Sequence, residues 1–271
     1  MSARDDATRA RAARLATPVP TPRADWAWFF DIDGTLIEFA ATPSAVRRDA
    51  ALQRLIARLH RAAGGALALI SGRSIADIDA LFPGTRLPVA GQHGVERRDA
   101  AGRVSRHAFP TERLAWARER LSEAASRHPG LLLEDKGLSL AVHYRRAPRL
   151  AGFAHRLVRS LQARLGDAYC VQTGKRVVEM KPAGRDKGGA VVEFLREAPF
   201  RGRVPVFVGD DVTDEYGFAM VNRARGHSVK VGAGRTVARL RLRDVRAVRE
   251  WLERGLAAPG GSRASPVERA P

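Results

Sequence analysis

Cysteine and long apolar runs are nearly absent from this chain. The single cysteine, Cys170, excludes an internal disulfide and any metal site built from several cysteines, and we interpret it as a small apolar strand residue. No run of about 20 apolar residues occurs, which argues against a membrane-spanning helix, and the first residues lack the apolar stretch of a secretory signal. We therefore expect a cytoplasmic protein with no membrane partner.

Lysine is also scarce. Only five of the 47 Lys and Arg residues are lysine, although the formal net charge is +18. Such a charge would suit an anionic partner such as nucleic acid. The arginines, however, are scattered among alanines along the whole chain, which favours a solvated basic surface. We expect no nucleic-acid partner.

The length and the pattern of the chain indicate a core domain with a second domain inserted into it. The 271 residues are enough for both. Residues 1–25 and 259–271 have the composition of disordered tails. We expect a core formed by residues 26–109 and 183–258, and a cap formed by residues 110–182.

Apolar strands alternate with helical patterns in both predicted halves of the core. The expected core elements are strands at residues 26–30, 66–71, 87–91, 204–211 and 227–232, and helices at residues 47–62, 75–81, 186–196, 214–222 and 244–255. This α/β rhythm predicts a Rossmann-like, doubly wound parallel sheet with helices on both faces. Between the halves, two units of a helix followed by a strand hairpin predict an α+β cap.

Two carboxylates follow the first predicted strand, at the edge of the sheet where such folds bind ligands. Asp31 and Asp33 are two residues apart, so both side chains point to the same side of the strand. Two adjacent carboxylates repel unless a cation lies between them or one is protonated. Mg²⁺ would resolve that conflict, with Asp210 as a possible third carboxylate.

Four motifs occur in an order that resembles the haloacid dehalogenase superfamily of phosphohydrolases. They are Asp-x-Asp-x-Thr after a strand, a serine that ends a strand, a lysine near a helix start, and an acidic cluster. The matching residues are Asp31, Asp33 and Thr35, then Ser71, then Lys187, and finally Asp210, Asp211 and Asp214. Taken alone, Ser71 would also suit a helix cap and Lys187 a solvated lysine.

The resemblance implies a role for each of these residues. Asp31 would be the nucleophile that forms an aspartyl-phosphate, and Asp33 the general acid and base. Ser71 and Lys187 would stabilise the phosphoryl charge. The implied Mg²⁺ would be held by Asp31, the main-chain carbonyl of Asp33 and Asp210, with Asp214 supporting the metal from outside.

Longer stretches narrow the resemblance to the trehalose-6-phosphate phosphatase family. They are SGR, GQHGVE, EDKGLSLAVHYR, VVEMKPAGRDKG and GDDVTDE. The resemblance implies hydrolysis of trehalose 6-phosphate, the final step of trehalose biosynthesis. The implied substrate-binding residues are Gly72, Arg73, Glu134, Lys136 and Glu179, the last three gripping sugar hydroxyls. We interpret His93 and His143 as structural histidines.

Other functions remain open at this stage. A capped phosphatase for another sugar phosphate, such as sucrose phosphate, and a phosphosugar mutase would use the same core motifs. A more remote alternative is a basic nucleic-acid-binding protein on an inactive phosphatase fold. We expect a monomer whose partner is a small sugar phosphate, with hinges near residues 108–111 and 181–184.

Overall fold

The computed structural model describes residues 18–38, 49–107, 109 and 112–257. Most of both predicted tails, and of the first predicted hinge, lies outside the described residues. Residues 18–25, which we assigned to the first tail, lie against the core in this structure. Trp251 Nε1 donates to the carbonyl of Pro20 at 2.8 Å, and Arg203 Nη1 donates to the carbonyl of Ala24 at 2.6 Å.

The larger sheet has the strand order β12-β11-β10-β1-β2-β3-β4-β5. Its strands are β1 (Trp26–Phe30), β2 (Leu67–Ile70), β3 (Val89–Gly91), β4 (Glu96–Arg98), β5 (Val104–Arg106), β10 (Val204–Gly209), β11 (His227–Val231) and β12 (Leu240–Leu242). The pairing is parallel from β12 to β3 and antiparallel from β3 to β5. The predicted α/β fold with a mainly parallel sheet is confirmed.

The differences from the predicted strands lie at sheet edges and strand ends. The sequence did not predict β4, β5 or β12, which are three residues each. All of β5 is exposed, so it has no alternation of buried and exposed residues that would identify a strand. The predicted strand over residues 204–211 ends at Gly209, because the next two aspartates belong to the loop.

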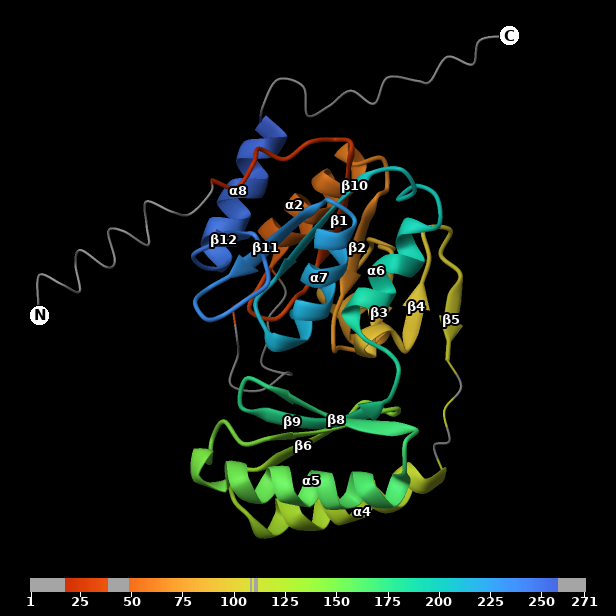
Figure 1. The fold of residues 1–271 in the computed structure, drawn as a ribbon, viewed down its shortest axis with the longest axis vertical. Coiled ribbons are helices and arrows are strands. Elements are labelled where there is room, and N and C mark those ends of the chain that lie inside the picture. The colour runs from red at the N-terminus through yellow and green to blue at the C-terminus, as the bar shows by residue number, and fades with distance from the viewer. Residues whose placement is uncertain (1–17, 39–48, 108, 110–111, 258–271) are drawn as a thin grey trace, which may run out of the picture.

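Helices cover both faces of this sheet (Figure 1). They are α2 (Ala50–Ala62), α3 (Ile75–Leu81), α6 (Lys187–Leu195), α7 (Glu215–Arg223) and α8 (Val245–Ala257). Successive residues of β1 face opposite ways: Trp28 packs on Trp251 of α8 with ring centroids 5.5 Å apart, and Phe29 packs on Phe194 of α6 at 6.1 Å. The central strand is therefore buried on both faces. No helix in the described ranges has the length and apolar character needed to cross a membrane.

A second, antiparallel sheet forms the cap, with the order β6-β7-β9-β8. Its strands are β6 (Leu132–Asp135), β7 (Leu140–His143), β8 (Tyr169–Gly174) and β9 (Val177–Pro182), and its helices are α4 (Glu112–Arg127) and α5 (Ala151–Leu165). The sheet lies between these helices and the core (Figure 1). One face of the cap sheet therefore packs on α4 and α5, and the opposite face is turned towards the core. The predicted domain boundaries stay predictions.

Candidate active site

The central strand β1 delivers Asp31 to the edge of the core that faces the cap. The main-chain N–H of Asp31 donates to the carbonyl of Val208 in β10 at 2.9 Å, which continues the parallel pairing up to this residue. Asp31 is only 4% exposed. An ionised carboxylate this deep in the protein needs charged or polar partners.

Lys187, the first residue of α6, supplies such a partner. Its Nζ donates to Asp31 Oδ1 and to Asp214 Oδ1, both at 2.7 Å. Burial alone would lower the pKa of Lys187, but the carboxylates of Asp214 and Asp31 outweigh it and raise this pKa above its ordinary value. The side chain therefore stays an ammonium, and the solvated lysine considered from the sequence is excluded because Lys187 is buried.

The loop after β10 folds Asp214 back beneath Asp210. Asp214 Oδ2 accepts the main-chain N–H groups of Asp210 and Asp211, both at 2.8 Å. This fold requires glycine at position 209, because a Cβ there would lie 2.4 Å from Cγ of Asp214. With the contact from Lys187, the carboxylate of Asp214 accepts three hydrogen bonds, which make it a fixed support of the loop.

Three carboxylates meet at this point. One oxygen from each of Asp31, Asp210 and Asp214 lies within 4.8 Å of the other two. Burial raises the pKa of Asp31 well above its usual range, and the negative charges of Asp214 and Asp210 add to this effect while Lys187 opposes it. A hard divalent cation suits such an all-oxygen set and would relieve the repulsion. The residues present therefore fit Mg²⁺.

Asp33 points to a different partner. Arg73 holds its carboxylate with two parallel hydrogen bonds, from Nε to Oδ2 at 2.6 Å and from Nη2 to Oδ1 at 2.7 Å. The side chain of Asp33 is not part of the three-carboxylate group. Only its main-chain carbonyl was expected to contact a metal, and that contact stays a prediction.

Ser71 holds the turn that carries Arg73. Ser71 is buried, and its Oγ accepts the main-chain N–H of Arg73 at 3.2 Å. The helix cap considered as an alternative for Ser71 is instead Ser74, whose Oγ accepts the N–H of Asp77 at 3.1 Å. Ser71 is therefore free of a capping role in α3.

The cap carries a second buried charged cluster, centred on Glu179. Lys136 Nζ donates to Glu179 Oε1 at 3.2 Å, Ser139 Oγ donates to the same oxygen at 2.7 Å, and His93 Nε2 lies 3.3 Å from Oε2. Burial would raise the pKa of Glu179, but Lys136 and then His93 outweigh it and hold this pKa well below its usual range. Glu134 of the same sheet pairs with His143 at 2.7 Å.

Two core residues, His93 and Gly72, border this cap cluster. His93 comes from the turn after β3, where its φ of 59° is in the left-handed region. A Cβ on Gly72 would lie 2.9 Å from His93 Nε2 and 3.7 Å from Lys136 Nζ, so the glycine leaves room for both side chains. His93 thus joins core to cap, a role that we did not predict from the sequence.

The sequence also missed two lysines. Lys175, between β8 and β9 of the cap, donates to Asp210 Oδ2, and Lys230 of β11 donates to the main-chain carbonyl of Asp210. Four of the five lysines, at positions 136, 175, 187 and 230, therefore donate to the acidic groups or the loop of this site. The scarcity of lysine in this arginine-rich chain was a signal that could have identified the two lysines that we missed.

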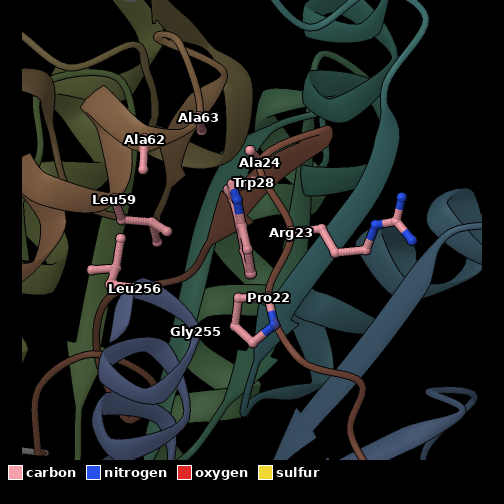
Figure 2. Close-up of a pocket in the computed structure, with 9 residues that line it drawn as sticks. All are labelled: Pro22, Arg23, Ala24, Trp28, Leu59, Ala62, Ala63, Gly255 and Leu256. Carbon is pink, nitrogen blue, oxygen red and sulfur yellow. The ribbon is translucent and has the colours of Figure 1, made fainter. Parts of the chain in front are cut away.

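A separate small pocket lies away from these carboxylates, between residues 22–24, α2 and α8 (Figure 2). Apolar side chains such as Trp28, Leu59 and Leu256 form much of its wall. Its charged residue, Arg23, extends away from it in Figure 2 and pairs with Asp25 at 2.9 Å. This pocket has no group for phosphoryl chemistry.

Comparisons with known proteins agree on one family. The family model described as trehalose-phosphatase matches residues 29–245. The trehalose-6-phosphate phosphatase of Escherichia coli is 44% identical over 237 residues, which cover 88% of this chain and 89% of that protein. A probable trehalose-phosphate phosphatase of Sinorhizobium fredii is 43% identical over 208 residues, covering 77% and 78% of the two chains.

Solved structures share the fold. The C-terminal domain of C. albicans trehalose-6-phosphate phosphatase superposes with a TM-score of 0.76 at 22% identity, covering 89% of this chain and 99% of that one. A haloacid dehalogenase-like hydrolase from B. subtilis superposes with a TM-score of 0.57 at 14% identity, covering 84% and 99%. At these identities the likeness concerns the arrangement of the chain.

Proposed function

The chain belongs to the trehalose-phosphatase family, and from that premise we propose how its residues hydrolyse trehalose 6-phosphate to trehalose and phosphate. The two charged clusters of the protein have different roles. The core cluster around Asp31 carries out phosphoryl transfer, and the cap cluster around Glu179 recognises the sugar. The observation that carries this division is the Asp33–Arg73 pair, because Arg73 holds Asp33 and also interacts electrostatically with Glu134 of the cap.

Asp31 is the nucleophile. Its carboxylate attacks phosphorus, the bond from phosphorus to the sugar oxygen breaks, and Asp33 gives its proton to that oxygen as trehalose leaves. Water then attacks the phosphorus of the aspartyl-phosphate, Asp33 accepts a proton from the water, and the carboxylate of Asp31 is restored. Lys187 holds Asp31 in place and offsets the negative charge of the phosphoryl group.

The acidic group would hold Mg²⁺ through Asp31, Asp210 and the main-chain carbonyl of Asp33. When bound, the cation supplies positive charge for the phosphoryl oxygens. Asp214 supports the site from outside rather than as a ligand, because its two oxygens already accept three hydrogen bonds, from Lys187 and from two main-chain N–H groups. Ser71 contributes by fixing the turn beside these groups.

Arg73 controls when Asp33 can act as an acid. Both carboxylate oxygens of Asp33 accept N–H groups of Arg73, so neither oxygen is available to the leaving oxygen of the sugar. Protonation of the leaving oxygen therefore requires that Arg73 releases at least one oxygen of Asp33 when substrate binds. Arg73 then remains beside the sugar, as its predicted substrate-binding role requires.

The cap residues stand on the side where the sugar leaves. Glu179, Glu134 and Asp33 all raise the pKa of Lys136, although burial opposes them, so this ammonium lies within electrostatic reach of the acid of the reaction. Glu134 likewise raises the pKa of Arg73, after Asp33 and against the effect of burial. Carboxylates and an ammonium in this position can bind paired sugar hydroxyls.

The remaining expectations about partners stay predictions. They are the monomeric state, the cytoplasmic location and the lack of a nucleic-acid partner. The sucrose phosphate, mutase and nucleic-acid alternatives gain no support from the contacts described above.

Phosphate release from a panel of substrates tests this proposal. We expect Mg²⁺-dependent turnover of trehalose 6-phosphate far above that of glucose 6-phosphate and sucrose 6-phosphate, and none in Asp31→Asn. Glu179→Gln should lower turnover of trehalose 6-phosphate by about 100-fold, since it removes a charge-assisted sugar contact and disturbs Lys136. Hydrolysis of a small aryl phosphate is the matched control, because this substrate has no sugar for the cap residues to bind.

An equal loss on both substrates would show that Glu179 does not recognise the sugar. Turnover that survives in Asp31→Asn would refute the nucleophile assignment instead.

A further inference from the structure

Lys175 of the cap donates a hydrogen bond to Asp210, which is also a proposed ligand of the cation. Lys175 lies in the turn between β8 and β9, and its Nζ donates to Asp210 Oδ2. The lysine side chain is 50% exposed, whereas that of Asp210 is 2% exposed. The ammonium thus enters from the cap and ends on a buried core carboxylate.

The main chain of the same turn also approaches the acidic loop. A Cβ on Gly174 would lie 3.1 Å from Asp211 Oδ2, so the turn is in close contact with this loop as well as with Asp210. Asp210 has further partners in the core: Lys230 donates to its main-chain carbonyl, and the hydroxyl of Thr35 lies 3.5 Å from Oδ1. Lys175 belongs to the cap, so its contact joins Asp210 to that domain.

The lysine ammonium groups around Asp210 cannot all stay in place when a divalent cation binds. Three ammonium groups, those of Lys187, Lys175 and Lys230, already contact the three aspartates Asp31, Asp210 and Asp214. A divalent cation would leave this group with an excess of positive charge, and on Asp210 it would share one carboxylate with the ammonium of Lys175. Lys187 and Lys230 are buried, so the half-exposed Lys175 is the ammonium that can move away from the aspartates.

We propose that Lys175 and the divalent cation compete for Asp210, so that cation binding releases this contact between cap and core. The inference rests on the proposed cation site. In the cation-free protein the ammonium tethers the cap to the acidic loop. Because coupling between two binding events is reciprocal, the tether weakens cation binding to the same degree as the cation weakens the tether.

Magnesium titration followed by calorimetry, without substrate, tests the competition. Lys175→Gln should bind Mg²⁺ about five-fold more tightly than the unchanged protein, the upper range for an ion pair with one exposed partner. Arg176→Gln is the matched control, because Arg176 is exposed in the same turn and carries the same charge. We expect it to change the affinity by less than about two-fold, as distant charges are screened by salt.

Hydrogen exchange of the turn gives a second readout that does not depend on activity. In the unchanged protein, Mg²⁺ should speed exchange of the main-chain N–H groups of residues 173–177. In Lys175→Gln, exchange there should already be fast and should not respond to Mg²⁺. Arg176→Gln should behave like the unchanged protein.

Equal effects of the two substitutions, or weaker Mg²⁺ binding in Lys175→Gln, would overturn the competition. Asp210→Asn separates this failure from failure of the cation site. If Asp210→Asn abolishes Mg²⁺ binding while Lys175→Gln leaves it unchanged, only the competition is wrong. If Asp210→Asn binds Mg²⁺ as tightly as the unchanged protein, the cation site itself is wrong, and the competition with it.

Discussion

Replacing Lys187 by methionine should destabilise the cation-free core strongly. The ammonium is 3% exposed and makes two ion pairs of 2.7 Å, with Asp31 and Asp214. Methionine fills a similar volume but leaves both buried carboxylates without a positive partner. Removing one member of a buried ion pair costs about 3–5 kcal/mol, and a lysine that serves two carboxylates should fall near the upper end of that range.

Urea unfolding in the presence of a chelator measures this cost. Three of the four tryptophans, Trp26, Trp28 and Trp251, are buried in the core, so tryptophan fluorescence follows mainly the domain that contains the substitution. We expect the free energy of unfolding to fall by about 4 kcal/mol, which corresponds to a loss of about 8–16 °C in Tm for a chain of this size.

A second substitution shows whether the cost comes from the unpaired carboxylates. Asp31→Asn in the Lys187→Met background removes one uncompensated charge, so the double variant should be more stable than Lys187→Met by about 1–2 kcal/mol. A loss below about 1 kcal/mol in Lys187→Met, or a double variant that is no more stable, would refute the reasoning.

Two further predictions concern the loop after β10 and the response to pH. Gly209→Ala should lower Mg²⁺-dependent phosphate release by about 100-fold, because the added Cβ would lie 2.4 Å from Cγ of Asp214 and would displace that side chain. Gly152→Ala in α5 is the control. Equal activity of the two variants would contradict the prediction. Burial lowers the pKa of His93 from 6.5, so its neutral form stabilises the fold fully above about pH 6.5, and this stability is lost as the pH falls below that value. The free energy of unfolding, measured from pH 5 to pH 8, should therefore depend less steeply on pH in His93→Gln, and an unchanged slope would count against this assignment.

Local sequence patterns determined the main elements and the chemistry of the core. The alternation of a strand places Asp31 and Asp33 on one side whatever lies around them, and the apolar run before them requires a buried strand. The ends of parallel strands meet at one edge, so Asp31, Ser71 and Asp210 could be assigned to one site before any contact was known. These inferences need only a few neighbouring residues and the handedness of the chain.

Only the tertiary structure decided how the two domains share the site. The contact of His93 with Glu179 and the contact of Lys175 with Asp210 join core to cap, between residues 86 and 35 positions apart. No periodicity specifies such pairs, because they depend on where the cap lies over the core. The same limit explains the edge strands β4, β5 and β12, whose pairing is set by their neighbours in the sheet rather than by an apolar pattern of their own.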